Sequence, residues 1–288
     1  MAKLAYLGLG VMGGPMARHL IERGHHQVTV YNRTSAKAEA FALAHGAKAA
    51  QTPREAAAGA DIVLACVGND HDLRAVTLGA DGAFAGMAMG TLFIDHTTAS
   101  ADVARELSGL GATKGIGFVD APVSGGQAGA EAGALTIMCG GTSANYAKAE
   151  PIMAAYAKAS RLMGASGAGQ LTKMVNQICI AGLVQGLAEG IAFAQKVGLD
   201  PLEVVASISK GAAQSWQMDN RHKTMTEGKF DFGFAVEWMR KDLGICLDTA
   251  RQTGAQLPVT ALVDQFYARI EQAGGRRFDT SSLIKLLS

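Results

Sequence analysis

Closely spaced glycines near the N-terminus, Gly8-Leu9-Gly10-Val11-Met12-Gly13, have the GxGxxG spacing of a phosphate-binding turn. They follow an apolar run that predicts a strand and precede a run that predicts a helix. In that setting the first glycine permits a tight turn, the second lets a pyrophosphate approach the backbone, and the third lets helix and strand pack closely. The helix N-terminus adds unpaired N–H groups and a positive dipole end. Residues 8–13 therefore predict a dinucleotide-binding site.

The residues at the end of the second expected strand, Asn32-Arg33-Thr34, bear on which dinucleotide binds. NAD-binding domains usually place a carboxylate there for the ribose 2′-hydroxyl, and this chain has none at that position. Arg33 can pair with a 2′-phosphate, while Asn32 and Thr34 offer further hydrogen-bonding groups. We therefore expect NADP(H) to be preferred, with NAD(H) the alternative if Arg33 is an ordinary solvated side chain.

Composition and charge narrow the class of protein. With 288 residues, 49% hydrophobic and 18% charged, the chain can form one large globular domain or two ordinary ones. A net charge of +1 gives no global field for nucleic acid or a membrane surface. The cysteines lie far apart with no CxxC pair, so we expect reduced thiols and no metal site. The N-terminus lacks a secretory signal pattern, and the apolar run 178–194 contains Gln185 and Glu189, which favours a buried helix in a cytoplasmic protein.

Short β-rich runs alternate with helical stretches over the first half of the chain, which is typical of a parallel sheet covered by helices on both faces. The expected strands are 4–8, 28–31, 47–50, 62–67, 92–95, 118–120, 135–139 and 161–163, and the first helices are 13–23 and 35–45. Beyond residue 164 the expected elements are helices, at 169–197, 201–210, 234–253 and 258–272. The predicted fold is α/β: an N-terminal Rossmann-type, doubly wound domain over residues 1–164, then an all-α C-terminal domain over 165–288.

Two further segments contain residue types suited to a small acid. Ser124-Gly125-Gly126 follows an expected strand, and its glycines let backbone N–H groups converge on a carboxylate, although the same residues could form a simple turn. Lys173 lies on an apolar-rich helix, with Asn176 on the same face. Burial lowers the pKa of an ammonium group, which suits proton transfer near neutral pH. Taken alone, Lys173 would more often be a surface lysine at a domain junction.

Together these segments resemble the β-hydroxyacid dehydrogenases, the family of 3-hydroxyisobutyrate dehydrogenase, glyoxylate/succinic semialdehyde reductase and tartronate semialdehyde reductase. The matching motifs occur in the family's order across nearly the whole chain. They are Gly13-Gly14-Pro15-Met16-Ala17, the run from Asp120 to Leu135, the run from Gly167 to Gln177, and Lys241-Asp242-Leu243.

The resemblance assigns roles to the substrate-facing residues. It implies that Lys173 is the catalytic acid and base, that Ser124, Gly125 and Gly126 hold the substrate carboxylate, and that Asn176 orients the substrate. Gln177 stands where many members have a second asparagine, so its role stays open. Residues 214–220 and 230–234 are expected to shape the acyl pocket, without indicating which acyl chain fits.

The resemblance also places residues beside the cofactor. Val67 and Gly68 would meet the nicotinamide half, and Thr98 would contact the cofactor in a Thr97-Thr98 pair where family members usually have Ser-Thr. Lys241 would lie close to both nicotinamide and substrate; by itself it is a lysine in a charged stretch. His96 is expected to be only a neighbouring loop residue.

The expected reaction is hydride transfer between a nicotinamide and a short β-hydroxy acid or its semialdehyde, without a metal. Proteins resembling this one assemble through the helical half, so a homodimer or homotetramer is expected. Three alternatives remain open. An imine reductase-like enzyme shares the architecture but generally lacks the lysine at position 173, and a decarboxylating 6-phosphogluconate dehydrogenase shares the ancestry of the fold but has a much longer C-terminal region. A catalytically silent dinucleotide-binding scaffold would not need Ser124, Lys173, Asn176 and Lys241 together.

Overall fold

The computed structural model describes residues 1–287, which divide into two compact units. The first unit is Met1–Lys173, and the second begins at Met174. This division falls within helix α9 (Ala168–Lys196). The sequence predicts that the first domain ends at residue 164, nine residues earlier. The first unit contains strands and helices, whereas the regular elements of the second are helices.

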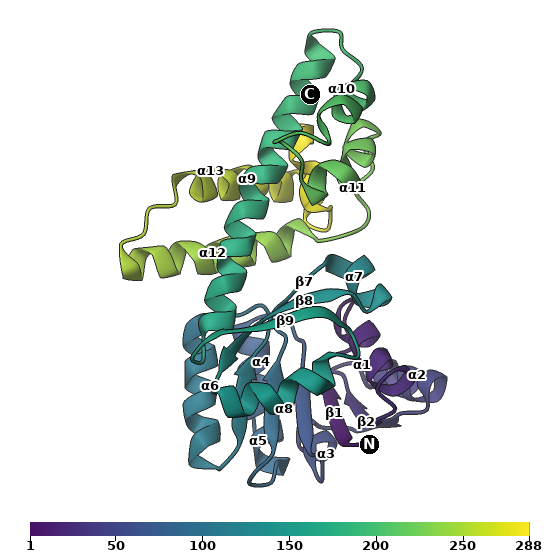
Figure 1. Ribbon diagram of the computed structural model, residues 1–288, viewed down its shortest axis with the longest axis vertical. Helices are drawn as coiled ribbons and strands as arrows, with labels where there is room; N and C mark the ends of the chain where they lie inside the picture. Colours follow the sequence, from purple (N-terminus) through teal and green to yellow (C-terminus); the bar gives the residue numbers. More distant parts are fainter. Residues whose placement is uncertain (288) are drawn as a thin grey trace. The chain divides into compact units, whose positions relative to one another are not determined.

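Within the described residues, the strands of the first unit form one nine-stranded sheet (Figure 1). They are β1 (Lys3–Leu7), β2 (Gln27–Tyr31), β3 (Lys48–Ala49), β4 (Ile62–Ala65), β5 (Leu92–Asp95), β6 (Gly117–Asp120), β7 (Val123–Ser124), β8 (Leu135–Gly141) and β9 (Ala157–Gly164). The order is β3-β2-β1-β4-β5-β6-β8-β7, with β9 paired to β8. From β3 to β6 all pairings are parallel, as the alternating pattern predicts.

The other end of the sheet departs from a purely parallel arrangement. Strand β8 pairs antiparallel with β6 and with β7, and parallel with β9. Only residues 125–134 separate β7 from β8. A parallel pair needs a crossover of about a dozen residues or more, so the short connection reverses the chain direction instead.

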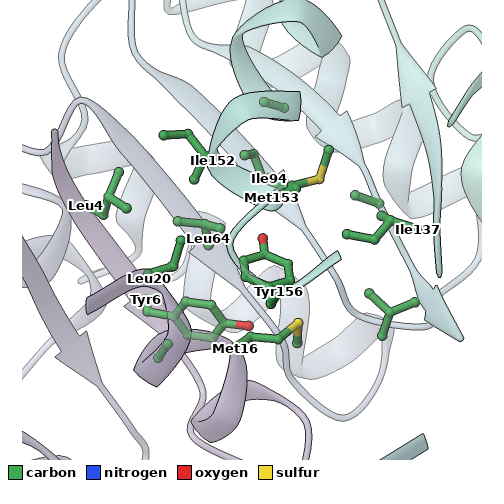
Figure 2. Close-up of a cluster of buried hydrophobic side chains, with 14 of the residues drawn as sticks. Leu4, Tyr6, Met16, Leu20, Leu64, Ile94, Ile137, Ile152, Met153 and Tyr156 are labelled. Atoms are coloured by element: carbon green, nitrogen blue, oxygen red, sulfur yellow. The ribbon is translucent and has the colours of Figure 1, made fainter. Parts of the chain in front are cut away.

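Two layers of helices cover the parallel part of the sheet. The helices of the first unit are α1 (Gly13–Glu22), α2 (Ser35–His45), α3 (Pro53–Ala57), α4 (Asp70–Leu78), α5 (Ala83–Gly86), α6 (Ala101–Thr113), α7 (Gly126–Ala132) and α8 (Ser143–Met153). Alternate residues of β1 contribute to the two cores: Leu4 and Tyr6 join the core under α1, α2 and α8, while Ala5 and Leu7 join the core under α3, α4, α5 and α6. Figure 2 shows part of the first core, where Tyr6 and Tyr156 lie among aliphatic side chains.

The second unit is built around the long helix α9. Its other helices are α10 (Pro201–Ile208), α11 (Trp216–Thr226), α12 (Val236–Thr253) and α13 (Pro258–Ile270), followed by a π-helical segment Glu271–Gly275 and a 3₁₀ helix Thr280–Leu286. By length and composition alone, α9 could cross a membrane. Its buried residues Ala181, Val184, Ala188 and Ile191, however, recur at helical spacing in a core with α12 and α13. Helix α9 is therefore a core helix, as its polar residues predict.

Helix α11 is a second departure from the sequence prediction. The sequence predicts no helix between residues 210 and 234, and it assigns residues 214–220 only to the acyl pocket. Ser215 caps this helix by accepting a hydrogen bond from the Met218 N–H at 3.1 Å. Capping rather than apolar patterning is thus the local signal for the helix.

Candidate functional site

The three glycines of the first loop occupy different environments. Gly8 has φ +96°, and a Cβ there would lie 2.4 Å from the carbonyl oxygen of Cys66. A Cβ at Gly13 would lie 2.0 Å from the carbonyl oxygen of Gly8. No heavy atom of the described chain lies within 4 Å of a Cβ built at Gly10. Packing therefore requires glycine at positions 8 and 13, whereas Gly10 leaves open space for a ligand to approach the backbone.

Helix α1 begins directly after this loop, and nothing within the described part of the chain caps it with a side chain. Its first turn also contains no acidic residue. The first N–H groups of a helix lack intrahelical acceptors and lie at the positive end of the helix dipole. The loop and helix together fit the pyrophosphate of a dinucleotide.

Hydrogen bonds between loops hold together the carboxyl ends of the central strands. The Leu9 N–H after β1 donates to Asn32 Oδ1 after β2, at 3.0 Å. The Val67 N–H after β4 donates to Thr97 Oγ1 after β5, at 3.1 Å. The residues predicted to bind the cofactor in the first unit, Val67 and Asn32 among them, therefore lie along one edge of the sheet. Asn32 therefore also holds the backbone of the glycine loop in place, through its bond to Leu9.

Arg33 extends from this edge into solvent. Its side chain is 86% exposed, and Nη1 lies 3.3 Å from Asp72 Oδ1 in the first turn of α4. Thr34, also exposed, is the N-cap residue of α2 without a side-chain capping bond. The arginine is therefore available at the position where a 2′-phosphate is expected, with its direction set by Asp72.

The Ser124-Gly125-Gly126 segment joins β7 to helix α7, an element that the glycine-rich sequence does not predict. Gly125 has φ +133° and Gly126 has φ +61°, conformations that L side chains rarely adopt. Gly125 is the N-cap residue of α7, and no side chain in the described chain caps this helix. Both glycines are exposed and Ser124 is half-buried. Backbone N–H groups and a hydroxyl in such a segment are donors of the kind that a carboxylate accepts from.

The start of helix α9 is fixed to the sheet by a buried carboxylate. Asp120 accepts hydrogen bonds from the Gly167 N–H at 2.8 Å and the Gln170 N–H at 3.0 Å. Burial raises the pKa of the Asp120 carboxyl, and these N–H donors oppose that rise. The Gln170 side chain donates to the Thr97 carbonyl at 2.7 Å and accepts from the Ala99 N–H at 3.1 Å. Helix α9 therefore begins at a defined position relative to β5 and β6.

Lys173 follows Gln170 by three residues on α9, so both side chains lie on the same face of the helix. Lys173 is 7% exposed, which is unusual for a lysine. Gln177 continues the same face, and it is 1% exposed. The spacing of these polar residues on an apolar helix is the sequence signal for a buried polar face, and the sequence prediction includes Lys173 and Asn176 but not Gln170.

In the second unit, two of the expected substrate residues belong to one polar cluster. Asn176 Nδ2 donates to Gln177 Oε1 at 2.8 Å, and Gln177 Nε2 donates to Asp242 Oδ2 at 2.6 Å. Lys241 Nζ lies 3.0 Å from Asp242 Oδ1. Asn176 and Lys241 are thus linked through Gln177, whose role the sequence leaves open, and through Asp242, for which no role is predicted.

His96, which directly precedes Thr97, lies in the protein interior and forms hydrogen bonds within the fold. His96 is buried, with Nδ1 2.6 Å from the Ala121 carbonyl and Nε2 2.7 Å from the Tyr156 hydroxyl. Burial lowers its pKa to about 4. Because a carbonyl only accepts, Nδ1 holds the proton and Nε2 accepts from Tyr156. Among residues 1–287 no group of three or more His, Cys, Asp or Glu side chains could hold a metal ion.

Comparison with known proteins agrees with this arrangement. Residues 3–177 match the family model for the NAD binding domain of 6-phosphogluconate dehydrogenase, and residues 167–287 match the one described as NAD-binding of NADP-dependent 3-hydroxyisobutyrate dehydrogenase. An uncharacterized oxidoreductase of Shewanella frigidimarina is 61% identical, over 100% of this chain and 98% of its own length.

Two named dehydrogenases are also similar over their whole length. The 3-hydroxyisobutyrate dehydrogenase of Pseudomonas aeruginosa is 32% identical, over 99% of this chain and 98% of its own. The solved structure of Mycobacterium tuberculosis 3-hydroxyisobutyrate dehydrogenase with L-serine is 32% identical, covers 100% of this chain and 99% of its own, and has a TM-score of 0.90. These matches confirm the resemblance, and the chain belongs to the β-hydroxyacid dehydrogenases, a family of oxidoreductases that bind a nicotinamide cofactor.

Proposed function

We propose that this protein is an NADP(H)-preferring β-hydroxyacid dehydrogenase that interconverts a short β-hydroxy acid and its semialdehyde or keto form. The observation that carries the proposal is the burial of Lys173 on a helix whose start is held by Asp120 and Gln170. A lysine ammonium is costly to bury, and a fixed backbone places it reproducibly. Both are properties of a group that transfers a proton.

The residues divide the chemistry between them. Ser124, Gly125 and Gly126 bind the substrate carboxylate through a hydroxyl and backbone N–H groups. Asn176 and Lys241 orient the rest of the substrate, and Lys241 also lies beside the nicotinamide. When bound, the nicotinamide supplies the hydride for reduction and accepts it for oxidation.

Lys173 handles the proton that accompanies the hydride. In reduction its ammonium donates to the carbonyl oxygen as the hydride reaches the carbon, leaving a neutral amine and an alcohol. In oxidation the amine takes the hydroxyl proton. Because a side chain performs this transfer, the proposed reaction needs no metal.

The cofactor binds along the edge of the sheet in this proposal. Residues 8–13 and the N-terminus of α1 hold the pyrophosphate, and Val67, Gly68 and Thr98 line the nicotinamide half. Arg33 pairs with the 2′-phosphate, with help from Asn32 and Thr34. The exposure of Arg33 and the absence of a carboxylate at positions 32–34 support NADP(H) over NAD(H).

We further propose that the protein works in the cytoplasm as a homodimer or homotetramer, without nucleic acid or membrane partners. Large apolar side chains of the second unit support self-association: Phe193 is 67% exposed, Val197 52% and Val259 60%. The expected solution mass is a multiple of 29.8 kDa. Light scattering after gel filtration measures it, and a mass of one chain at micromolar concentration would contradict the proposal.

The test of the reaction is a substrate panel with both cofactors. We expect NADPH-dependent reduction of glyoxylate, succinic semialdehyde or tartronate semialdehyde, or oxidation of 3-hydroxyisobutyrate or L-serine, ranked by kcat/KM. Lys173→Ala should lose most of the turnover while NADPH fluorescence still reports binding. Near-normal turnover by that variant would refute the role of Lys173, and no turnover of any substrate by the native protein would favour a silent scaffold.

A further inference from the structure

A chain of hydrogen bonds connects helices α9 and α12 inside the second unit. Gln177 of α9 and Asp242 of α12 are each 1% exposed, and the Gln177 amide bonds Asp242 at 2.6 Å and Asn176 at 2.8 Å. Such a buried polar chain is costly unless its members find partners. At either end lies a residue with a proposed substrate role, Asn176 and Lys241.

Chemistry fixes the direction of these bonds. The Asp242 carboxylate can only accept, so the NH₂ group of Gln177 must face it. The Gln177 carbonyl oxygen then faces Asn176, whose NH₂ group must donate to it. This polarity leaves the Asn176 carbonyl oxygen outside the chain of bonds, as an acceptor for the hydroxyl of a ligand.

At the other end of this chain of hydrogen bonds, Asp242 pairs with the charged side chain of Lys241. Asp242 meets the Lys241 ammonium at 3.0 Å through Oδ1, as an ion pair without a well-aligned hydrogen bond. Oδ2 is held by Gln177. Without the Gln177 amide, the carboxylate would lose the bond that fixes its plane, and the direction of Lys241 would loosen with it.

We propose that Gln177 is a positioning residue: its single amide orients Asn176 and, through Asp242, Lys241 toward the same substrate. The inference rests on the proposed function, which places Asn176 and Lys241 against the substrate. In this role Gln177 acts through its neighbours, because its amide is engaged by Asp242 and Asn176. The arrangement suits a substrate that offers a hydroxyl hydrogen to Asn176 and an acceptor oxygen to Lys241, as a hydroxy acid does.

Two substitutions separate positioning from bulk stability. Gln177→Met keeps the length of the side chain and removes both bonds, so kcat/KM for the acid should fall roughly 10- to 100-fold, mainly through KM. Gln177→Glu cannot donate to Asp242 when ionised but can when protonated. Its activity should therefore approach that of the native enzyme at acidic pH and fall as pH rises, with an ionisation that the native profile lacks.

Gln185 provides the matched control, because it lies on the same helix and its amide bonds only Glu189, at 2.7 Å. Gln185→Met and Gln185→Glu should keep kcat/KM within about twofold, with a native pH profile. Circular dichroism and thermal unfolding confirm folding for every variant. If Gln177→Met does not fold, the pH profile of Gln177→Glu alone tests whether Gln177 is a positioning residue.

Two results would overturn the proposal: near-native kcat/KM for Gln177→Met, or a Gln177→Glu profile parallel to the native one. A double-mutant cycle of Gln177→Met and Asp242→Leu, which lacks an acceptor, in urea unfolding gives a readout independent of activity. The two effects should be markedly less than additive, because each removes the same bond. If the native protein turns over no acid, the proposed function fails, and additive unfolding effects would separately overturn the hydrogen-bond chain.

Discussion

The guanidinium of Arg33 lies 3.3 Å from the carboxylate of Asp72, although the two residues are 39 positions apart. Arg33 follows β2 and Asp72 lies in the first turn of α4, so the pair joins the segment after β2 to the start of α4. An exposed ion pair of this kind adds little stability, on the order of 1 kcal/mol or less. Its consequence is geometric: a flexible arginine is kept over the place where the cofactor's ribose is expected.

Arg33→Glu should therefore change the cofactor preference. The introduced carboxylate repels a 2′-phosphate and can accept from a 2′-hydroxyl, so the ratio of kcat/KM for NADPH to that for NADH should fall by roughly 10-fold or more. Steady-state kinetics with both cofactors measure it. Lys114→Glu, the same charge change at an exposed position in the first unit, is the control. An unchanged ratio in Arg33→Glu would show that this arginine does not select the cofactor.

Two buried tyrosines of one core should respond oppositely to removal of their hydroxyls. The Tyr156 hydroxyl donates to His96 at 2.7 Å, so Tyr156→Phe leaves a buried acceptor unsatisfied and should cost about 1–3 kcal/mol of unfolding free energy. The Tyr6 hydroxyl has no hydrogen-bond partner among the described residues, so Tyr6→Phe should be neutral or stabilising. Urea unfolding compares them, and equal losses in both would contradict the assigned hydrogen bonds.

The start of α9 should be far more sensitive to a methyl group than its middle. A Cβ at Gly169 would lie 2.5 Å from the Met138 carbonyl oxygen and 2.6 Å from that of Asp120. At Gly186, by contrast, no heavy atom of the described residues lies within 4 Å of an added Cβ. Gly169→Ala should lose about 1–3 kcal/mol of stability and lower kcat, because it displaces the turn that positions Lys173. Gly186→Ala should gain about 0.5–1 kcal/mol. If Gly169→Ala is destabilised but keeps the native kcat, the start of α9 does not determine the position of Lys173.

Asp95 should make stability depend on pH. Burial raises the pKa of its carboxyl from 3.8 to about 7, with hydrogen bonds from Thr97 opposing the shift. A raised pKa in the folded state means that the stabilising contribution is complete below about pH 4 and is lost as pH rises toward 7. By 1.36 kcal/mol per pKa unit, the loss is on the order of 4 kcal/mol.

Asp95→Asn removes this ionisation while keeping an oxygen for the Thr97 N–H, which donates at 2.9 Å. The variant should match the native protein near pH 4 and exceed it in stability at pH 8. Denaturant titrations from pH 4 to 8.5 give the difference, and His96, present in both proteins, cancels from it. A difference that does not vary with pH would rule out Asp95 as the titrating group.

Local patterns were sufficient for much of the fold. The glycine loop, the buried strand β4 and the helical second half each follow from short-range signals of spacing and apolar content. The reversal at β8 does not, because strand direction depends on a connection length that is readable only once α7 is known. Helix α7 contains glycines that disfavour a helix intrinsically, and its neighbours override that preference.

The candidate site shows the same limit at the level of side chains. The role of Lys173 is predicted because its segment resembles a family motif, whereas Asp120, Gln170 and Gln177 act through hydrogen bonds to partners 47 to 73 residues away. No local pattern encodes such a partner. For the same reason, the sequence treats Asn32 only as a cofactor ligand, while the structure also uses it to support Leu9.

The open space above Gly10 has a consequence for how this gene can vary. At Gly8 and Gly13 an added methyl group meets backbone atoms, so a random library screened for soluble expression would discard those changes. Variants at Gly10 would pass the same screen, because the fold by itself places nothing there. Only a growth selection that demands turnover would remove them, so comparing the two screens separates the glycine kept by folding from the one kept by the ligand.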